Sequence, residues 1–306
     1  MGLALRLAFV PPFVPGQRAV TPRLAIRPIL LLALVAGGGC MPPSWGANAI
    51  LHPQRRPMTR QPARLFDAVE LDGAGVKLKG WWFHAGERRG TLVFLHGVSD
   101  NRGTSAGIAD HFVARGFDVI AYDSRAHGES GGDACTYGFY EKQDLARVLD
   151  RVETRPIVLM GTSMGAAIAL QAAAVDRRVG AVIAVSAFSD LRTAATERAP
   201  FFASKGNIAE AFRLAEEAGK FRVDDVSPMA AAAHVTAPTL VIHGGKDDET
   251  TPAHSQRIFA ALQGQKRLIL VPNTGHSHVI DAQIWRDIDT WLDVALAGAA
   301  GAAGGH

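Results

Sequence analysis

The chain is organised around residues 155–175, which read RPIVLMGTSMGAAIALQAAAV. An apolar run at 157–160 is followed by Gly161-Thr162-Ser163-Met164-Gly165, and then by an alanine-rich stretch without helix breakers. A strand, a tight turn with a serine at its apex and a helix form the context of a nucleophile elbow. Glycines two residues either side of the serine suit a strained turn in which strand and helix approach too closely for side chains. The stretch predicts Ser163 as a nucleophile at the carboxyl edge of a sheet.

The same glycine pattern occurs again around Ser105, between Gly103 and Gly107. This copy follows the polar residues 99–102 and not an apolar strand, so we interpret it as a loop that leads into a helix. The structural context therefore selects Ser163.

Composition predicts one large domain behind a basic leader. The chain has 306 residues, is 48% hydrophobic and carries a formal charge of +3. Residues 1–39 contain four arginines and no acid, which leaves 28 basic against 29 acidic residues in 40–306. We therefore expect no nucleic-acid-binding surface.

Residues 1–39 are predicted to be a signal peptide or lipoprotein leader. The apolar run 29–36 is far shorter than the roughly 20 residues of a membrane-spanning helix but suits a signal-peptide core. Cys40 follows directly and resembles the lipidation site of bacterial lipoproteins, although Gly37 stands where such signals usually have leucine. An ordinary signal peptide, or a misassigned start with an incidental cysteine, is the alternative. We expect an exported protein, periplasmic or anchored to a membrane through Cys40. Cys135 is the only other cysteine, so no internal disulfide is implied if Cys40 is lipidated, and two cysteines are too few for a cysteine metal site.

Strands and helices alternate from residue 64 to 297. Residues 65–71 and 76–83 read as a hairpin, and apolar runs at 91–95, 117–121, 157–160, 181–185, 239–243 and 267–271 are separated by helical patterns. This pattern predicts an α/β fold with a mostly parallel sheet of about eight strands and helices on both faces. Residues 40–63, rich in proline and arginine, are predicted to be a linker, and the Gly/Ala-rich residues 298–306 a disordered tail.

One insertion interrupts this alternation before the penultimate strand, over about residues 188–232. Ile208, Ala211, Phe212 and Ala215 mark an amphipathic helix within it. The helix either packs on the core or forms a small cap over the active site.

A serine nucleophile needs a base that is oriented by a carboxylate, and in the α/β-hydrolase order the acid precedes the histidine. Asp247 and Asp248 follow the strand at 239–243, and His276 follows the strand at 267–271. All of them therefore stand at carboxyl ends of strands, where sites in open α/β sheets form.

Five segments in this order resemble the α/β-hydrolase family over about residues 64–297, most closely lipase- or esterase-like serine hydrolases. They are 95–97 (LHG), 122–130 (YDSRAHGES), 161–165 (GTSMG), 243–247 (HGGKD) and 274–276 (TGH). The resemblance implies Asp247 as the acid, with Asp248 as the alternative, and His276 as the base, with His278 on the rim. It implies an oxyanion hole formed by the backbone N–H groups of Val98 and Met164.

Three neighbouring residues, Asp123, Arg125 and His127, are expected to fix a loop beside the site, and His96 to serve as a structural loop residue and not as a second base. The predicted activity is hydrolysis of small carboxylic esters through an acyl-enzyme, without a metal or organic cofactor. A peptidase, amidase or thioesterase could use the same triad, and a non-catalytic ligand-binding protein is the alternative of another class.

Overall fold

The computed structural model describes residues 42–59 and 61–303, with side chains up to residue 297. The predicted leader and Cys40 lie outside the described residues. No helix among the described residues combines the length and the apolar character needed to cross a membrane.

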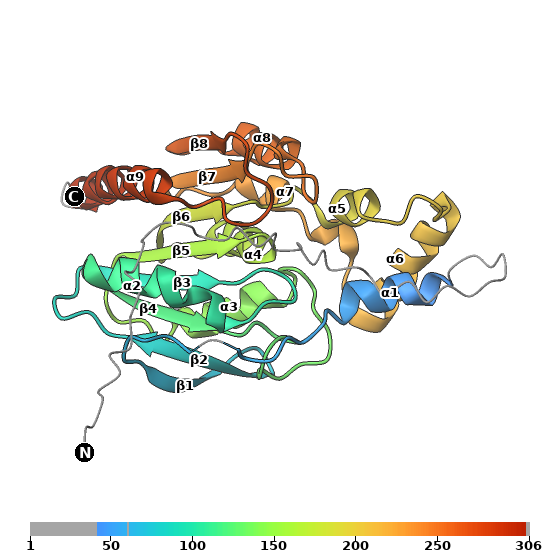
Figure 1. The fold of residues 1–306 in the computed structure, drawn as a ribbon, viewed down its shortest axis with the longest axis horizontal. Helices are drawn as coiled ribbons and strands as arrows, with labels where there is room; N and C mark the ends of the chain where they lie inside the picture. Colours follow the sequence, from blue (N-terminus) through green and yellow to red (C-terminus); the bar gives the residue numbers. More distant parts are fainter. Residues whose placement is uncertain (1–41, 60, 304–306) are drawn as a thin grey trace, which may run out of the picture. The chain divides into compact units, whose positions relative to one another are not determined.

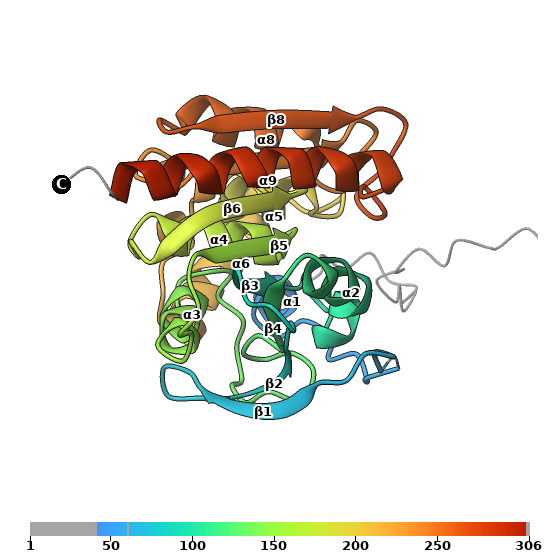
Figure 2. The same cartoon turned by 90° about the vertical axis from the view of Figure 1, so that its left-hand side faces the viewer.

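An eight-stranded sheet forms the centre of the domain, as predicted. Its strands are β1 (Asp67–Asp72), β2 (Lys77–Phe83), β3 (Gly90–Leu95), β4 (Phe117–Tyr122), β5 (Ile157–Thr162), β6 (Val179–Val185), β7 (Thr239–Gly244) and β8 (Lys266–Val271). They follow one another in the order β1-β2-β4-β3-β5-β6-β7-β8, which can be traced from bottom to top in Figure 1. Figure 2 shows the same sheet turned by 90°, with β1 at the bottom and β8 at the top. The pairs β1–β2 and β2–β4 are antiparallel and all the others are parallel. The parallel strands therefore place their carboxyl ends at one edge.

Helices cover both faces of this sheet. On one face α3 (Glu141–Leu149), α4 (Met164–Ala173) and α8 (Pro252–Ala261) bury apolar side chains such as Leu145, Leu170 and Ile258. On the other face α2 (Ala106–Ala114) and α9 (Ala282–Ala303) bury Phe112 and Ile288. Strands β3 to β5 lie between these two layers, which explains why their sequences are apolar almost throughout.

The insertion before β7 folds into α5 (Leu191–Glu197), α6 (Lys205–Gly219), the 3₁₀ turn Val223–Asp225 and α7 (Pro228–Ala232). Figure 1 shows α5 and α6 grouped beyond one edge of the sheet, together with α1 (Pro43–Leu51). Phe188, Leu191 and Phe212 form a cluster with Ala167, which lies one helical turn after Ser163. The insertion therefore packs beside the predicted nucleophile.

The prediction of a linker over 40–63 is wrong for the residues that the structure describes, because these are part of the folded domain. Helix α1 packs on α6 so closely that a Cβ on Gly46 would lie 2.9 Å from Cβ of Ala211. Ala47 and Leu51 are buried, and the backbone carbonyl of Leu51 accepts a hydrogen bond from Cys135 N at 2.8 Å. These partners are distant in sequence, so the local pattern held no sign of them.

Residues after α1 are also fixed to the domain. The Arg55 guanidinium donates to the carbonyl oxygens of Ser130 and Gly132, at 2.6 Å each. The Asn101 side chain, from the loop after β3, donates to the carbonyl of Arg56 at 3.1 Å. The segment therefore links α6 to the loops that follow β3 and β4.

The predicted disordered tail is also wrong for most of its length. Helix α9 continues through Ala303, because the glycines that suggested disorder are interspersed with alanines, the strongest helix formers. Residues 304–306 lie outside the described part.

Candidate active site

Ser163 occupies the strained turn that its sequence predicts. It stands between β5 and α4 with φ 51° and ψ −113°, a left-handed conformation that costs energy for a residue with a side chain. Its N–H donates to the carbonyl of Val185 at 2.8 Å. A Cβ on Gly161 would lie 2.2 Å from the carbonyl carbon of Gly165, and one on Gly165 would lie 2.1 Å from the carbonyl oxygen of Leu95. Side chains are therefore excluded at both glycines, as expected.

The three residues predicted from chain order meet at the carboxyl edge of the sheet. Nε2 of His276 lies 3.0 Å from Oγ of Ser163, and Nδ1 of His276 lies 2.7 Å from Oδ2 of Asp247. With a proton on Nδ1, the imidazole donates to the carboxylate and leaves Nε2 to accept from the serine hydroxyl. The three side chains thus form a continuous hydrogen-bonded chain.

Hydrogen bonds in and around the loop after β7 keep Asp247 ionised. Its side chain is fully buried, and Oδ1 accepts from the backbone N–H groups of Glu249 and Thr250 at 3.0 and 2.9 Å. Burial raises the pKa of Asp247, but hydrogen bonds from His243, His276 and the Thr250 N–H outweigh it and leave the pKa well below its usual range. Asp248, the alternative acid, is exposed to solvent. The structure places Asp247 against His276.

His243 is the residue that the sequence analysis missed in this site. It is fully buried at the end of β7, and its Nε2 lies 3.0 Å from Oδ2 of Asp247 and 2.7 Å from the carbonyl of Thr250. Its Nδ1 lies 2.6 Å from Oγ of Ser255. With a proton on Nε2, the imidazole donates to the carbonyl of Thr250 while the same nitrogen lies beside Asp247, and Nδ1 can accept from the Ser255 hydroxyl. A histidine near the end of a strand that is otherwise mostly apolar could have indicated these contacts, since a buried polar side chain requires hydrogen-bond partners.

The loop after β3 brings backbone donors beside the nucleophile. A Cβ on Gly97, the residue before Val98, would lie 3.7 Å from Cβ of Ser163, so this loop passes next to the nucleophile. Met164 is the first residue of α4, and the N–H groups of a first helical turn have no acceptor within the helix. Among the described residues no hydrogen-bond partner is found for either N–H. Both remain available to a ligand, and the helix N-terminus favours negative charge there.

The imidazole of His96 holds the loop after β3 in place through hydrogen bonds. Its Nδ1 donates to the carbonyl of Gly97 at 2.7 Å, and its Nε2 accepts from Ser124 N at 2.9 Å. Complete burial, followed by the neighbouring His127, lowers the pKa of His96 to about 3. His96 is therefore neutral with both nitrogens occupied, which agrees with a structural role and leaves it no capacity to act as a base.

The loop after β4 is fixed by buried charges, as expected. Asp123 accepts from the backbone N–H groups of Arg102 and Glu129, at 2.7 and 2.9 Å, and pairs with the Arg102 guanidinium. Arg125 binds both carboxylate oxygens of Asp144 at 2.7 Å. Nδ1 of His127 contacts the carbonyl of Arg125 at 2.8 Å. No hydrogen bond in the described part of the chain joins Asp123, Arg125 or His127 to the three active-site side chains.

Two remaining serine and histidine candidates lie outside this arrangement. Ser105 is buried and donates to the carbonyl of Arg102 at 2.7 Å, within the turn that leads into α2. His278, expected on the rim, is exposed.

Comparison with known proteins agrees with this geometry. A model of the alpha/beta hydrolase family matches residues 92–286, and the chain therefore belongs to that family. "Uncharacterized protein YqkD" of Bacillus subtilis is 30% identical over 213 residues, which cover 66% of this chain and 70% of that protein. Polyketide transferase ATR5 of Stachybotrys chlorohalonatus is 25% identical over 263 residues, which cover 68% and 89%.

A solved esterase shares the fold. The Pyrococcus furiosus esterase Pf2001 superimposes with a TM-score of 0.65 at 20% identity, over 80% of this chain and 98% of the esterase. Family membership supports a hydrolase, and the likeness to the esterase shows the fold.

Proposed function

We propose that the protein is a serine hydrolase that cleaves carboxylic esters through an acyl-enzyme. The observation that carries the proposal is the hydrogen-bonded chain Ser163–His276–Asp247, together with two backbone N–H groups that have no acceptor in the described part of the chain. A hydrogen bond to His276 activates a serine hydroxyl that is otherwise a weak nucleophile.

In the first half of the proposed reaction, Oγ of Ser163 attacks the ester carbonyl while Nε2 of His276 takes the hydroxyl proton. The carbonyl oxygen becomes an oxyanion and is bound by the N–H groups of Val98 and Met164. His276 then returns the proton to the departing alcohol as the C–O bond breaks. Asp247, ionised and buried, stabilises the imidazolium between these steps.

In the second half, water attacks the acyl carbon and gives a proton to His276. The same two N–H groups bind the second oxyanion. When it collapses, the bond to Ser163 breaks, the carboxylic acid leaves and the proton returns to Oγ. No further group is needed to balance the atoms.

The insertion points to substrates with an apolar acyl or alcohol part. Phe188, Leu191 and Phe212 give its inner cluster an apolar character next to α4. Peptidase, amidase or thioesterase activity would use the same residues, because the fold does not determine the leaving group. A panel of p-nitrophenyl esters of increasing chain length, with amide and thioester controls, separates these possibilities.

Labelling with a fluorophosphonate probe tests the proposal directly. The wild-type protein should label covalently and hydrolyse short p-nitrophenyl esters, and Ser163→Ala should lose both properties. Ser105→Ala is the matched control, since Ser105 has the same glycine spacing but donates to a backbone carbonyl. An unlabelled wild type, or a labelled Ser163→Ala variant, would refute the proposal and favour a non-catalytic ligand-binding protein.

A further inference from the structure

Exposed aromatic side chains gather on one part of the described chain. The large hydrophobic side chains that reach solvent include three aromatic ones, Trp45 (58% exposed), Phe201 (99%) and Phe202 (51%). The aliphatic ones, Leu65, Val175, Leu270 and Val294, are single residues on four separate segments. Scattered aliphatic residues are normal on a protein surface, whereas grouped aromatic ones mark an interaction site.

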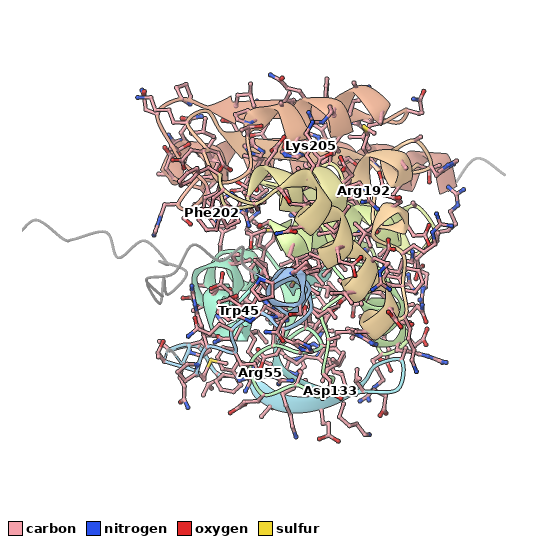
Figure 3. All side chains as sticks on the ribbon, turned by 90° about the vertical axis from the view of Figure 1, so that its right-hand side faces the viewer. Trp45, Arg55, Asp133, Arg192, Phe202 and Lys205 are labelled. Atoms are coloured by element: carbon pink, nitrogen blue, oxygen red, sulfur yellow. The ribbon has the colours of Figure 1, made fainter. Side chains whose placement is uncertain are left out.

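The packing of α1 on α6 brings these aromatic residues to one end. Gly46 faces Ala211 and Leu51 faces Gly219, so the two helices run parallel and begin on the same side. Trp45 stands in the first turn of α1, and Phe201 and Phe202 lie in the turn shortly before α6, with their ring centroids 5.4 Å apart. Figure 3 shows Trp45 and Phe202 on one face. We call the starting ends of α1 and α6, with these three side chains, the aromatic end.

Basic side chains accompany the aromatic ones on this face. Lys205, the first residue of α6, is exposed, whereas Arg192 on α5 pairs with Asp224 and lies 3.7 Å from Glu216; both basic residues are labelled with Phe202 in Figure 3. Aromatic rings combined with Lys and Arg are typical of protein surfaces that rest at the interface of a phospholipid bilayer.

The preceding chain supplies a second argument. Residues 1–41 lead directly into α1 at the aromatic end, and they contain the apolar run 29–36 and four arginines without an acid. A segment of that composition favours a bilayer surface, and it joins the domain where the exposed aromatic residues lie.

We propose that the aromatic end is a docking surface for a phospholipid bilayer. Trp45, Phe201 and Phe202 enter the interface between headgroups and acyl chains, while Lys205 contacts anionic headgroups. The inference is independent of the proposed ester hydrolysis, because it concerns binding and not turnover.

A positional test separates docking at this end from binding through the leader alone. The full 306-residue chain carrying Phe202→Trp is mixed with vesicles of phosphatidylcholine and phosphatidylglycerol (3:1), with and without brominated acyl chains. Brominated lipid should quench the added fluorescence of residue 202. Leu65→Trp is the matched control, because Leu65 is also exposed but lies before β1, and its added fluorescence should not be quenched.

A partition test then measures the contribution of the rings. In vesicle flotation, Phe201→Ala/Phe202→Ala should reduce the partition coefficient at least about tenfold, given the transfer free energy of two aromatic rings. Leu65→Ala/Val175→Ala should leave it within about twofold, since side chains that stay in water contribute no transfer free energy.

Three outcomes would overturn the proposal. The first is a wild-type chain that does not float with vesicles. The second is a residue 202 that stays unquenched in a protein that does float, which would indicate that residues 29–36 bind alone or cover the rings. The third is a dimer, detected by sedimentation, that the double phenylalanine variant loses while its vesicle partition is unchanged, which would assign the surface to a second copy of the chain.

Discussion

His243 Nε2 lies 3.0 Å from Oδ2 of Asp247, the same oxygen that faces His276. Oδ1 is held separately by the backbone of Glu249 and Thr250. The carboxylate therefore cannot rotate without losing hydrogen bonds at both oxygens. His243 acts on the site through Asp247, as a positioning residue.

Replacing His243 by glutamine should weaken this restraint without touching the substrate. We expect kcat to fall by about tenfold to a hundredfold, since small displacements in a site cost that much, while KM stays within about twofold, since the change spares ground-state binding. Steady-state kinetics on a p-nitrophenyl ester and the rate of fluorophosphonate labelling measure the effect. Ser255→Ala removes the hydroxyl that contacts Nδ1 of His243 and should have a smaller effect of the same kind. A rise in KM alone would contradict the positioning role.

Asp247→Asn and Asp248→Asn form a matched pair that separates the acid from its neighbour. Loss of the carboxylate that orients the imidazole is expected to lower kcat by about 10⁴, as in other serine triads. Asp248 is exposed, and its replacement should leave kcat within about twofold, as is usual for surface substitutions. Equal losses of kcat in the two variants would mean that the conformation of the loop, and not the carboxylate of Asp247 alone, determines the activity.

Gly165→Ala should disrupt the elbow even though alanine favours helices. The added Cβ would lie 2.1 Å from the carbonyl oxygen of Leu95, so backbone has to move, and we expect a loss of about 2 kcal/mol or more in the free energy of unfolding. Gly107→Ala is the control, because nothing lies within 4 Å of its added Cβ. Urea denaturation should find Gly107→Ala unchanged or stabilised by up to about 1 kcal/mol. Similar stabilities for both variants would argue against the close approach of α4 to β3.

Stability should fall in mild acid because His96 is buried neutral. The pKa of His96 is lowered from 6.5 to about 3 by burial, and burial lowers the pKa of His127 in the same direction. Below pH 6.5 the unfolded chain therefore binds protons that the folded chain excludes, and each such histidine costs about 1.4 kcal/mol per pH unit down to its folded pKa. His96→Asn should be less stable at pH 7.5 but should lose stability less steeply between pH 6.5 and 4.5, as measured by urea midpoints.

An exposed histidine provides the comparison for this slope. His278→Asn should follow the wild-type dependence on pH, because His278 is exposed. An unchanged slope in His96→Asn would show that other groups control the acid sensitivity.

The elbow and the three active-site residues could be predicted because each is encoded locally. The apolar run of β5, the two glycines and the alanine-rich start of α4 are adjacent in sequence, and Asp247 and His276 each follow an apolar strand. Helix α1 could not be predicted in the same way, since its buried face is narrow and its partners on α6 are far away in sequence. The role of His243 was missed for a related reason, because it depends on where Asp247 and Ser255 lie in space.

The packing of α1 on α6 limits how far the chain can be shortened for recombinant expression. The family match begins at residue 92, and a cut at residue 64 would look safe from the strand pattern. Either cut would uncover Phe212 and Phe221, which share a buried cluster with Ala47 and Leu51, and would leave Cys135 N without its acceptor. Shortened proteins of this kind should be prone to aggregation, and an expression boundary placed ahead of Pro43 keeps the hydrophobic cluster closed.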